Sequence, residues 1–219
     1  LHNSLGVCYG ETGEFVSALK QFKEAMALDA EEALAHYNAG NVQLLLDESD
    51  KARAHLLEVD NRPHNLFEVR LQLGKLYLED DQPEKGLIYL EKAAAMQPQS
   101  SAVHAFIGEC YAALDRRDEA VAAYKKSLRL NANDAASLSG LGWLYKVMEN
   151  NADIAKLFCR HSTAIAPRNA LFHHRLGCLY LKEDRLSEAR DEFQKAVDLG
   201  RDSAAQLAEV QSRLLDKAS

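Results

Sequence analysis

The sequence has little proline or glycine and no basic stripe. Its 219 residues include only 4 prolines and 11 glycines, while Ala, Leu, Glu and Lys are abundant, which favours helix over strand. The formal net charge is −7 and no run of five like charges occurs, so we expect neither nucleic acid nor an anionic membrane as a partner. No stretch of about 18 uncharged apolar residues could span a bilayer.

Cysteines are few and dispersed. The four cysteines, Cys8, Cys110, Cys159 and Cys178, form no C-x-x-C pair, so we expect free thiols in a reducing, cytoplasmic compartment. No secretory signal pattern is present. The sequence starts at Leu1 within a helical pattern, from which we expect a fragment of a longer protein.

Motifs of catalysis are also missing. The sequence contains no G-x-S-x-G, no phosphate-binding G-x-x-x-x-G-K-[ST], no G-x-G-x-x-G and no H-E-x-x-H. Four of the eight histidines share one repeat position, which indicates a packing slot: His2, His36, His104 and His173. We therefore expect no enzyme activity, no metal site and no cofactor.

What the sequence does contain is a repeat of 34 residues. Its clearest marker is a column of glycines, the last after an interval of 35: Gly6, Gly40, Gly74, Gly108, Gly142 and Gly177. A tyrosine follows three residues after five of them, and Gln43 breaks that column. An insertion near Asn150–Asn151 accounts for the longer interval.

Three further columns accompany each glycine. Twelve residues after it comes a small residue, then a large one four residues later, then a small one three residues beyond. In the first repeat these are Ala18, Phe22 and Ala25. Apolar residues at three- and four-residue spacing predict two amphipathic helices in each repeat.

This pattern resembles the tetratricopeptide repeat family, through Leu5-Gly6…Tyr9, Ala18…Phe22…Ala25 and a terminal Pro98. The resemblance implies an all-α fold, a right-handed superhelix of stacked antiparallel helical hairpins. The expected units are 1–32, 33–66, 67–100, 101–134, 135–169 and 170–202, followed by a capping helix over 203–219. An apolar stripe of Leu207, Val210, Leu214 and Leu215 supports the cap, and the start of a seventh repeat is the alternative.

By the same resemblance, the chain is a non-catalytic scaffold that binds a peptide or helix of a partner protein. The first helix of each hairpin would line a concave groove, with these candidate contacts: Asn3, Tyr37, Asn38, Asn41, Gln72, Lys75, Glu109, Trp143, Lys146 and Arg175. Carboxamides can hold a peptide backbone. Trp143 is the expected anchor, and Lys146 and Arg175 could pair with a partner's carboxylate.

The sequence is also compatible with other functional hypotheses. Chaperone-binding members of the family use a two-carboxylate clamp, which is absent because Tyr37, Gln72 and Phe106 occupy clamp positions. The chain could instead be a regulatory segment of a longer enzyme, such as a bacterial signalling protein or a glycosyltransferase. Self-association is a third possibility, through an uncapped first repeat that would partly expose four apolar residues: Leu1, Leu5, Leu19 and Phe22.

Overall fold

The computed structural model describes residues 1–28, 33–61, 66–148 and 152–218, and the described residues form helices and turns without a strand. The insertion expected near Asn150–Asn151 lies outside the described residues. None of the described helices is long and apolar enough to cross a membrane. The helices of the described ranges are α1 (His2–Glu11), α2 (Phe15–Leu28), α3 (Ala33–Leu45), α4 (Ser49–Asp60), α5 (Phe67–Glu79), α6 (Pro83–Met96), α7 (Ser101–Ala113), α8 (Arg117–Leu130), α9 (Ala135–Val147), α10 (Ala152–Ile165), α11 (Ala170–Lys182), α12 (Leu186–Asp198) and α13 (Ala204–Ala218).

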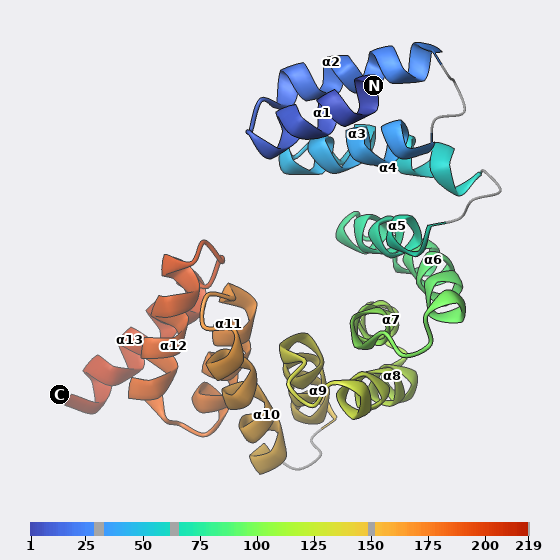
Figure 1. Ribbon diagram of the computed structural model, residues 1–219. Helices are drawn as coiled ribbons and strands as arrows, with labels where there is room; N and C mark the ends of the chain where they lie inside the picture. Colours follow the sequence, from blue (N-terminus) through green and yellow to red (C-terminus); the bar gives the residue numbers. More distant parts are fainter. Residues whose placement is uncertain (29–32, 62–65, 149–151, 219) are drawn as a thin grey trace. The chain divides into compact units, whose positions relative to one another are not determined.

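The chain divides into two compact units, Leu1–Pro98 and Gln99–Ser219. In the first unit, α1 packs on α2, α3 on α4 and α5 on α6, while α2 also contacts α3 and α4 contacts α5 (Figure 1). The second unit repeats this arrangement with α7/α8, α9/α10 and α11/α12, and α13 packs on α12. In this unit α9 also contacts both α7 and α11. The predicted all-α fold of stacked hairpins is confirmed.

The glycine column is the line of closest approach within each hairpin. A Cβ added to Gly74 would lie 2.5 Å from Leu90 Cγ, and one added to Gly177 would lie 2.8 Å from Phe193 Cδ1. The side chain in contact is always the large column residue of the same hairpin, and each is at most 1% exposed: Phe22, Leu56, Leu90, Tyr124, Cys159 and Phe193. The repeat of 34 residues therefore corresponds to one hairpin, in which the glycine has no Cβ and so leaves room for the facing side chain.

The described turns inside the hairpins carry a second repeat that the sequence pattern did not reveal. Asp47, Asp81, Asp115 and Asp184 have φ between 54° and 58°, and Gly13 has φ of 80°. Four of these five positions are spaced by 34 residues. The left-handed conformation is one that Asp tolerates better than most residues do, and that Gly adopts without a steric penalty.

Replacing Asp81 by glycine is expected to raise the free energy of unfolding by about 0.5–1 kcal/mol, since the left-handed strain is relieved. Asp184→Gly is the matched control, because Asp184 holds ion pairs with Arg213, at 2.7 Å, and with Lys217. Asp184→Gly should raise the free energy of unfolding less than Asp81→Gly does, or should lower it. Thermal denaturation of both variants tests this, and equal gains would contradict the role given to the ion pairs.

The histidine column forms polar links between the two helices of a hairpin. His2 Nδ1 lies 2.8 Å from Gln21 Oε1, and His173 Nδ1 lies 2.6 Å from Glu192 Oε2. In the second hairpin the partner is another histidine, with 3.0 Å between the Nδ1 atoms of His36 and His55. Each pair is 19 residues apart. The repeat position that the histidines share therefore serves hydrogen bonding as well as packing, because a buried ring nitrogen needs a hydrogen-bond partner.

The His36–His55 pair should make the stability of the first unit depend on pH. Burial lowers the pKa of His55 below its ordinary 6.5, against the opposing effect of Glu58. The unfolded chain therefore binds this proton more readily, so the free energy of unfolding should fall as pH drops from 6.5 to the lowered pKa. Urea denaturation at several pH values between about 7 and 5 measures this change in the free energy of unfolding.

His55→Gln is the matched control for that titration, because it recreates the link that His2 makes with Gln21. This variant should lose part of the pH dependence while it keeps a hydrogen bond across the hairpin. An unchanged pH profile in His55→Gln would show that other groups cause the dependence.

The ends of the chain differ from expectation at two residues. In α13, Val210 is fully buried against α11 and α12 with Leu207 and Leu214 beside it, but Leu215 is 72% exposed, because it lies about 100° further around the helix than Leu214. At the start, Leu5 is exposed, whereas Phe22 is buried against Gly6. Phe22 is therefore not part of any exposed apolar surface, contrary to the expectation.

Candidate functional site

Five of the polar and aromatic side chains on the first helices of the second unit form one cluster. Glu109 comes from α7, Ser139, Trp143 and Lys146 come from α9, and Arg175 comes from α11. The three α9 residues are spaced by four and three positions, which places them on one face of the helix. We call this cluster the Trp143 site.

Two cations flank the indole ring. Lys146 Nζ lies 4.1 Å from the centroid of the Trp143 ring, and Arg175 Cζ lies 5.9 Å from it. All three side chains are half-buried. These distances are within the range of cation–π attraction, so the three side chains hold one another in place while leaving part of the ring exposed.

Arg175 links α11 to α9. Its Nη1 donates a hydrogen bond of 3.0 Å to the Ser139 hydroxyl. The start of α9 is fixed by Asp134, whose carboxylate accepts from the Ser137 backbone N–H at 2.8 Å. Burial lowers the pKa of Arg175 from its ordinary value, with a further contribution in the same direction from Arg201.

Glu109 is the carboxyl group of this cluster, and it acts electrostatically on Arg175. Burial raises the pKa of Glu109, and Asp134 raises it further, while Arg175 acts in the opposite direction. No ion pair joins Glu109 to Arg175 in the described part of the second unit. The positive charge of the site is therefore only partly balanced by the protein itself.

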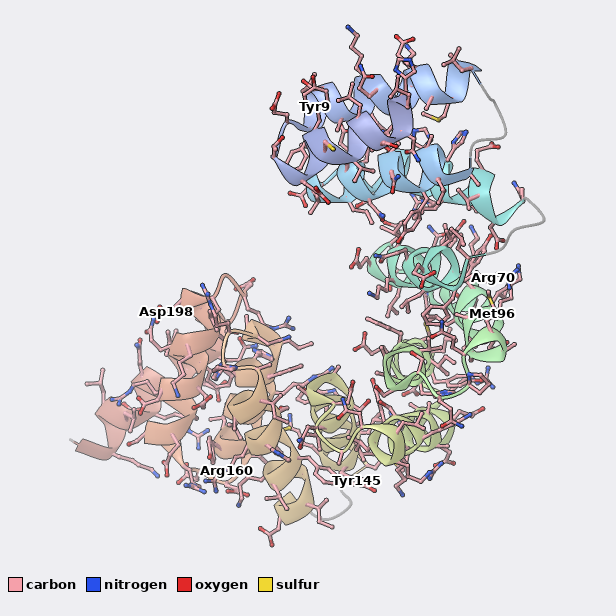
Figure 2. The ribbon with its side chains drawn as sticks, in the orientation of Figure 1. Tyr9, Arg70, Met96, Tyr145, Arg160 and Asp198 are labelled. Carbon is pink, nitrogen blue, oxygen red and sulfur yellow. The ribbon has the colours of Figure 1, made fainter. Side chains whose placement is uncertain are left out.

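A cavity of about 360 Å³ adjoins the site. It shares Lys146 with the Trp143 site and is lined by Tyr145, Lys146, Ala152, Leu179, Lys182 and Glu183. Figure 2 labels Tyr145, whose ring stacks on Phe158 of α10 at a centroid distance of 6.1 Å. The lining combines three apolar or aromatic side chains with two lysines and with the Glu183 carboxylate, which pairs with Lys156.

The other six candidate residues belong to the first unit. The Asn38 amide donates to Asn3 Oδ1 at 3.0 Å, so these two carboxamides partly satisfy each other. Tyr37 packs on the core around Leu56. The remaining three are half-buried on α3 and α5: Asn41, Gln72 and Lys75. The structure thus brings together Asn3 with Asn38, and separately Trp143 with its charged neighbours.

The thiol and imidazole groups of the second unit show no sign of activation. Burial raises the pKa of Cys110 and of Cys159 to about 12. His174 Nε2 lies 3.6 Å from Cys178 Sγ, but burial raises the pKa of this thiol too, which opposes a nucleophilic role. Among the described residues, no three His, Cys, Asp or Glu side chains are placed to hold a metal ion.

Comparison with known proteins decides the family. Residues 5–65, 77–144 and 170–202 each match a family model described as tetratricopeptide repeat. The chain belongs to the tetratricopeptide repeat family. Tetratricopeptide repeats in general are non-catalytic scaffolds for protein–protein interaction.

The curated relatives of this tetratricopeptide repeat chain are distant. It is 21% identical over 194 residues to the human protein O-mannosyl-transferase TMTC1, covering 87% of the chain and 22% of the transferase. It is 23% identical over 155 residues to the type IV pilus assembly protein PilF of Pseudomonas aeruginosa, covering 70% of the chain and 62% of PilF. The chain therefore spans less than two thirds of either relative.

Solved structures support the tetratricopeptide fold. The Pseudomonas aeruginosa PilF structure superposes with a TM-score of 0.75 at 20% identity, covering 97% of this chain and 96% of PilF. YrrB, described as a tetratricopeptide repeat protein with an unusual peptide-binding site, gives 0.68 at 22% identity, covering 79% of this chain and 89% of YrrB. At these identities the likeness concerns the fold alone.

Sequence reasoning missed two parts of the surroundings of the Trp143 site. Ser203 is buried, and its hydroxyl lies 2.8 Å from His174 Nδ1. Arg201, in the segment between α12 and α13, contributes to the electrostatics of His174, Arg175 and Cys178. Neither residue belongs to a repeat column, so periodicity could not have pointed to them.

Proposed function

We propose that the chain is a non-catalytic scaffold that binds a peptide segment or a helix of a partner protein on the faces of its first helices, with the Trp143 site as the anchor. The observation that carries the proposal is the half-buried indole of Trp143 with two cations over its ring, on a helix face that carries no packing column. Exposed aromatic rings fixed by neighbours are typical centres of binding energy. The peptide-binding description of YrrB gives independent support.

The first unit offers candidate contacts of its own to a peptide backbone. Asn41 and Gln72 carry amide groups that both donate and accept, and Lys75 carries a positive charge. Asn3 and Asn38 would contribute less, because part of their hydrogen-bonding capacity is used between them. Tyr37 completes the proposed contacts of the first unit, and Glu109 completes those of the Trp143 site.

Panning a random peptide library on the intact chain tests this proposal. Peptides should be enriched, and Trp143→Ala should weaken the binding of most of them by about tenfold or more, as expected for a central anchor. Leu157→Ala is the matched control, because it removes an exposed apolar side chain on α10 of the same unit. No enrichment, or equal binding by Trp143→Ala, would contradict the proposal.

A second candidate function is that of a regulatory or substrate-recruiting segment in a larger enzyme. The observation that favours it is the match of 87% of this chain to only 22% of an O-mannosyl-transferase. The parent coding sequence on both sides of these residues distinguishes the two functions. An adjoining catalytic domain would favour the second function, and its absence the first.

Self-association through the first repeat stays a prediction, with Leu1, Leu5 and Leu19 as its remaining apolar residues. Light scattering over a concentration series measures it. A mass that stays that of one chain at all concentrations would contradict it.

A further inference from the structure

Two cations lie over the Trp143 ring, and a third acts on one of them through its charge. Lys146 Nζ and Arg175 Cζ lie 4.1 Å and 5.9 Å from the ring centroid, and Arg201, in the segment after α12, acts electrostatically on Arg175. Within the described ranges, none of the three forms an ion pair. Arg175 makes its hydrogen bond to a neutral hydroxyl instead.

Several cations elsewhere in the second unit pair with carboxylates. Arg185 pairs with Glu188 at 2.6 Å, Lys156 with Glu183 at 2.8 Å, and Arg213 with Asp184 at 2.7 Å. A protein with a net charge of −7 has many carboxylates available for such pairs. At the Trp143 site, by contrast, the two cations nearest the indole contact its ring, and Arg175 donates to a neutral hydroxyl.

All three cations act electrostatically on His174. The pKa of His174 is lowered first by burial and then by Arg201, Lys146 and Arg175, which all act in the same direction. Like charges gathered in a half-buried place oppose folding, and a bound anion would relieve that repulsion. Glu109 acts on Arg175 in the opposite direction, and burial raises the pKa of Glu109.

We propose that the Trp143 site binds an acidic segment of a partner protein, in which at least two Asp or Glu carboxylates flank an apolar side chain. The carboxylates would lie among Lys146, Arg175 and Arg201, and the apolar side chain would pack on Trp143 or enter the adjoining cavity beside Leu179. This proposal rests on the proposed function, because it specifies what the same site binds.

The chemistry of the two arginines favours carboxylates over a diffuse negative surface. A guanidinium group has five N–H donors in a planar fork, and one donor of Arg175 is used within the described residues. The others can hold a carboxylate in a bidentate pair. Nucleic acid is disfavoured, since three cations in one place do not form the extended stripe that a phosphate backbone requires.

The test uses synthetic peptides and the fluorescence of Trp143, which is the single tryptophan of the chain. One peptide carries four glutamates around a central Leu–Phe pair, a second has glutamine at those four places, and a single-stranded oligonucleotide serves as the other anion. The acidic peptide should change the fluorescence and saturate. The glutamine peptide should bind about tenfold more weakly or worse, and high salt should reduce the difference.

Arg201→Gln is the decisive variant, because Arg201 is exposed and its replacement should leave the fold intact. It should weaken the acidic peptide by about threefold to tenfold, with little effect on the glutamine peptide. Arg190→Gln is the matched control, since it removes an exposed cation of α12 that pairs with Asp191. It should bind like the unaltered chain.

The outcomes separate this inference from the proposed function. Equal binding of both peptides, with loss in Trp143→Ala, would overturn the acidic ligand and leave the scaffold function in place. Binding of the oligonucleotide in preference to the acidic peptide would overturn the assignment to a protein segment. No fluorescence change with any peptide, together with an unproductive library, would overturn both.

Discussion

Gly142→Ala is expected to destabilise the second unit by about 2–3 kcal/mol, although alanine favours a helix by about 1 kcal/mol over glycine. The added Cβ would lie 2.8 Å from Cys159 Sγ and 2.9 Å from the Ala155 carbonyl oxygen. A backbone oxygen in a packed helix cannot move as the end of a flexible side chain can. The hairpin of α9 and α10 must therefore open, and urea denaturation measures the loss.

Gly40→Ala is the matched control, at the same repeat position in the first unit. Its Cβ would meet Leu56 at 3.3 Å and the Ala52 carbonyl oxygen at 3.4 Å, so shifts of a few tenths of an ångström suffice. The gain in helix propensity of about 1 kcal/mol should offset most of this cost. Equal losses in both variants would show that the glycine column acts through something other than close approach.

Tyr124→Ala should cost about 3–5 kcal/mol, the largest loss that we expect from a single substitution. The Tyr124 ring is 1% exposed and lies against two glycines: a Cβ on Gly108 would be 2.7 Å from the ring, and one on Gly140 would be 2.4 Å from it. One side chain thus joins α7, α8 and α9. The free energy of unfolding of a typical domain is about 5–15 kcal/mol, so such a loss is a large part of it.

Tyr124→Phe separates the ring from its hydroxyl group. The ring contacts remain, so the loss should stay within about 1 kcal/mol. Calorimetry of the two variants gives the comparison. A small loss in Tyr124→Ala would mean that the neighbouring helices can close the space, and that the interior is not as tightly packed as the glycine contacts indicate.

The repeat columns could be predicted from the sequence because each column has one physical purpose. A glycine every 34 residues, followed 16 residues later by a large side chain, defines which atoms meet, and those side chains are buried as expected. The turn aspartates escaped notice because Asp is common in any polar turn. Their shared left-handed conformation becomes visible only in the backbone angles.

The Trp143 site was predictable in part. Helical phase placed Trp143 and Lys146 on one face, and the repeat period placed Arg175 on the adjoining helix. Arg201 was not predictable, because the path of a non-helical segment depends on how α13 packs. Whether two carboxamides bind a ligand or each other, as Asn3 and Asn38 do, depends on distances that a sequence pattern does not contain.

Titration of a library-selected peptide, followed by the indole ¹H–¹⁵N resonance of Trp143, tests most directly whether a partner segment binds at this place. We expect the chemical shift of this single indole resonance to change until one peptide is bound per chain. Backbone amides of α9 and α11 should shift with it. Binding that is measurable by calorimetry but leaves the Trp143 resonance unmoved would place the partner elsewhere and contradict the account.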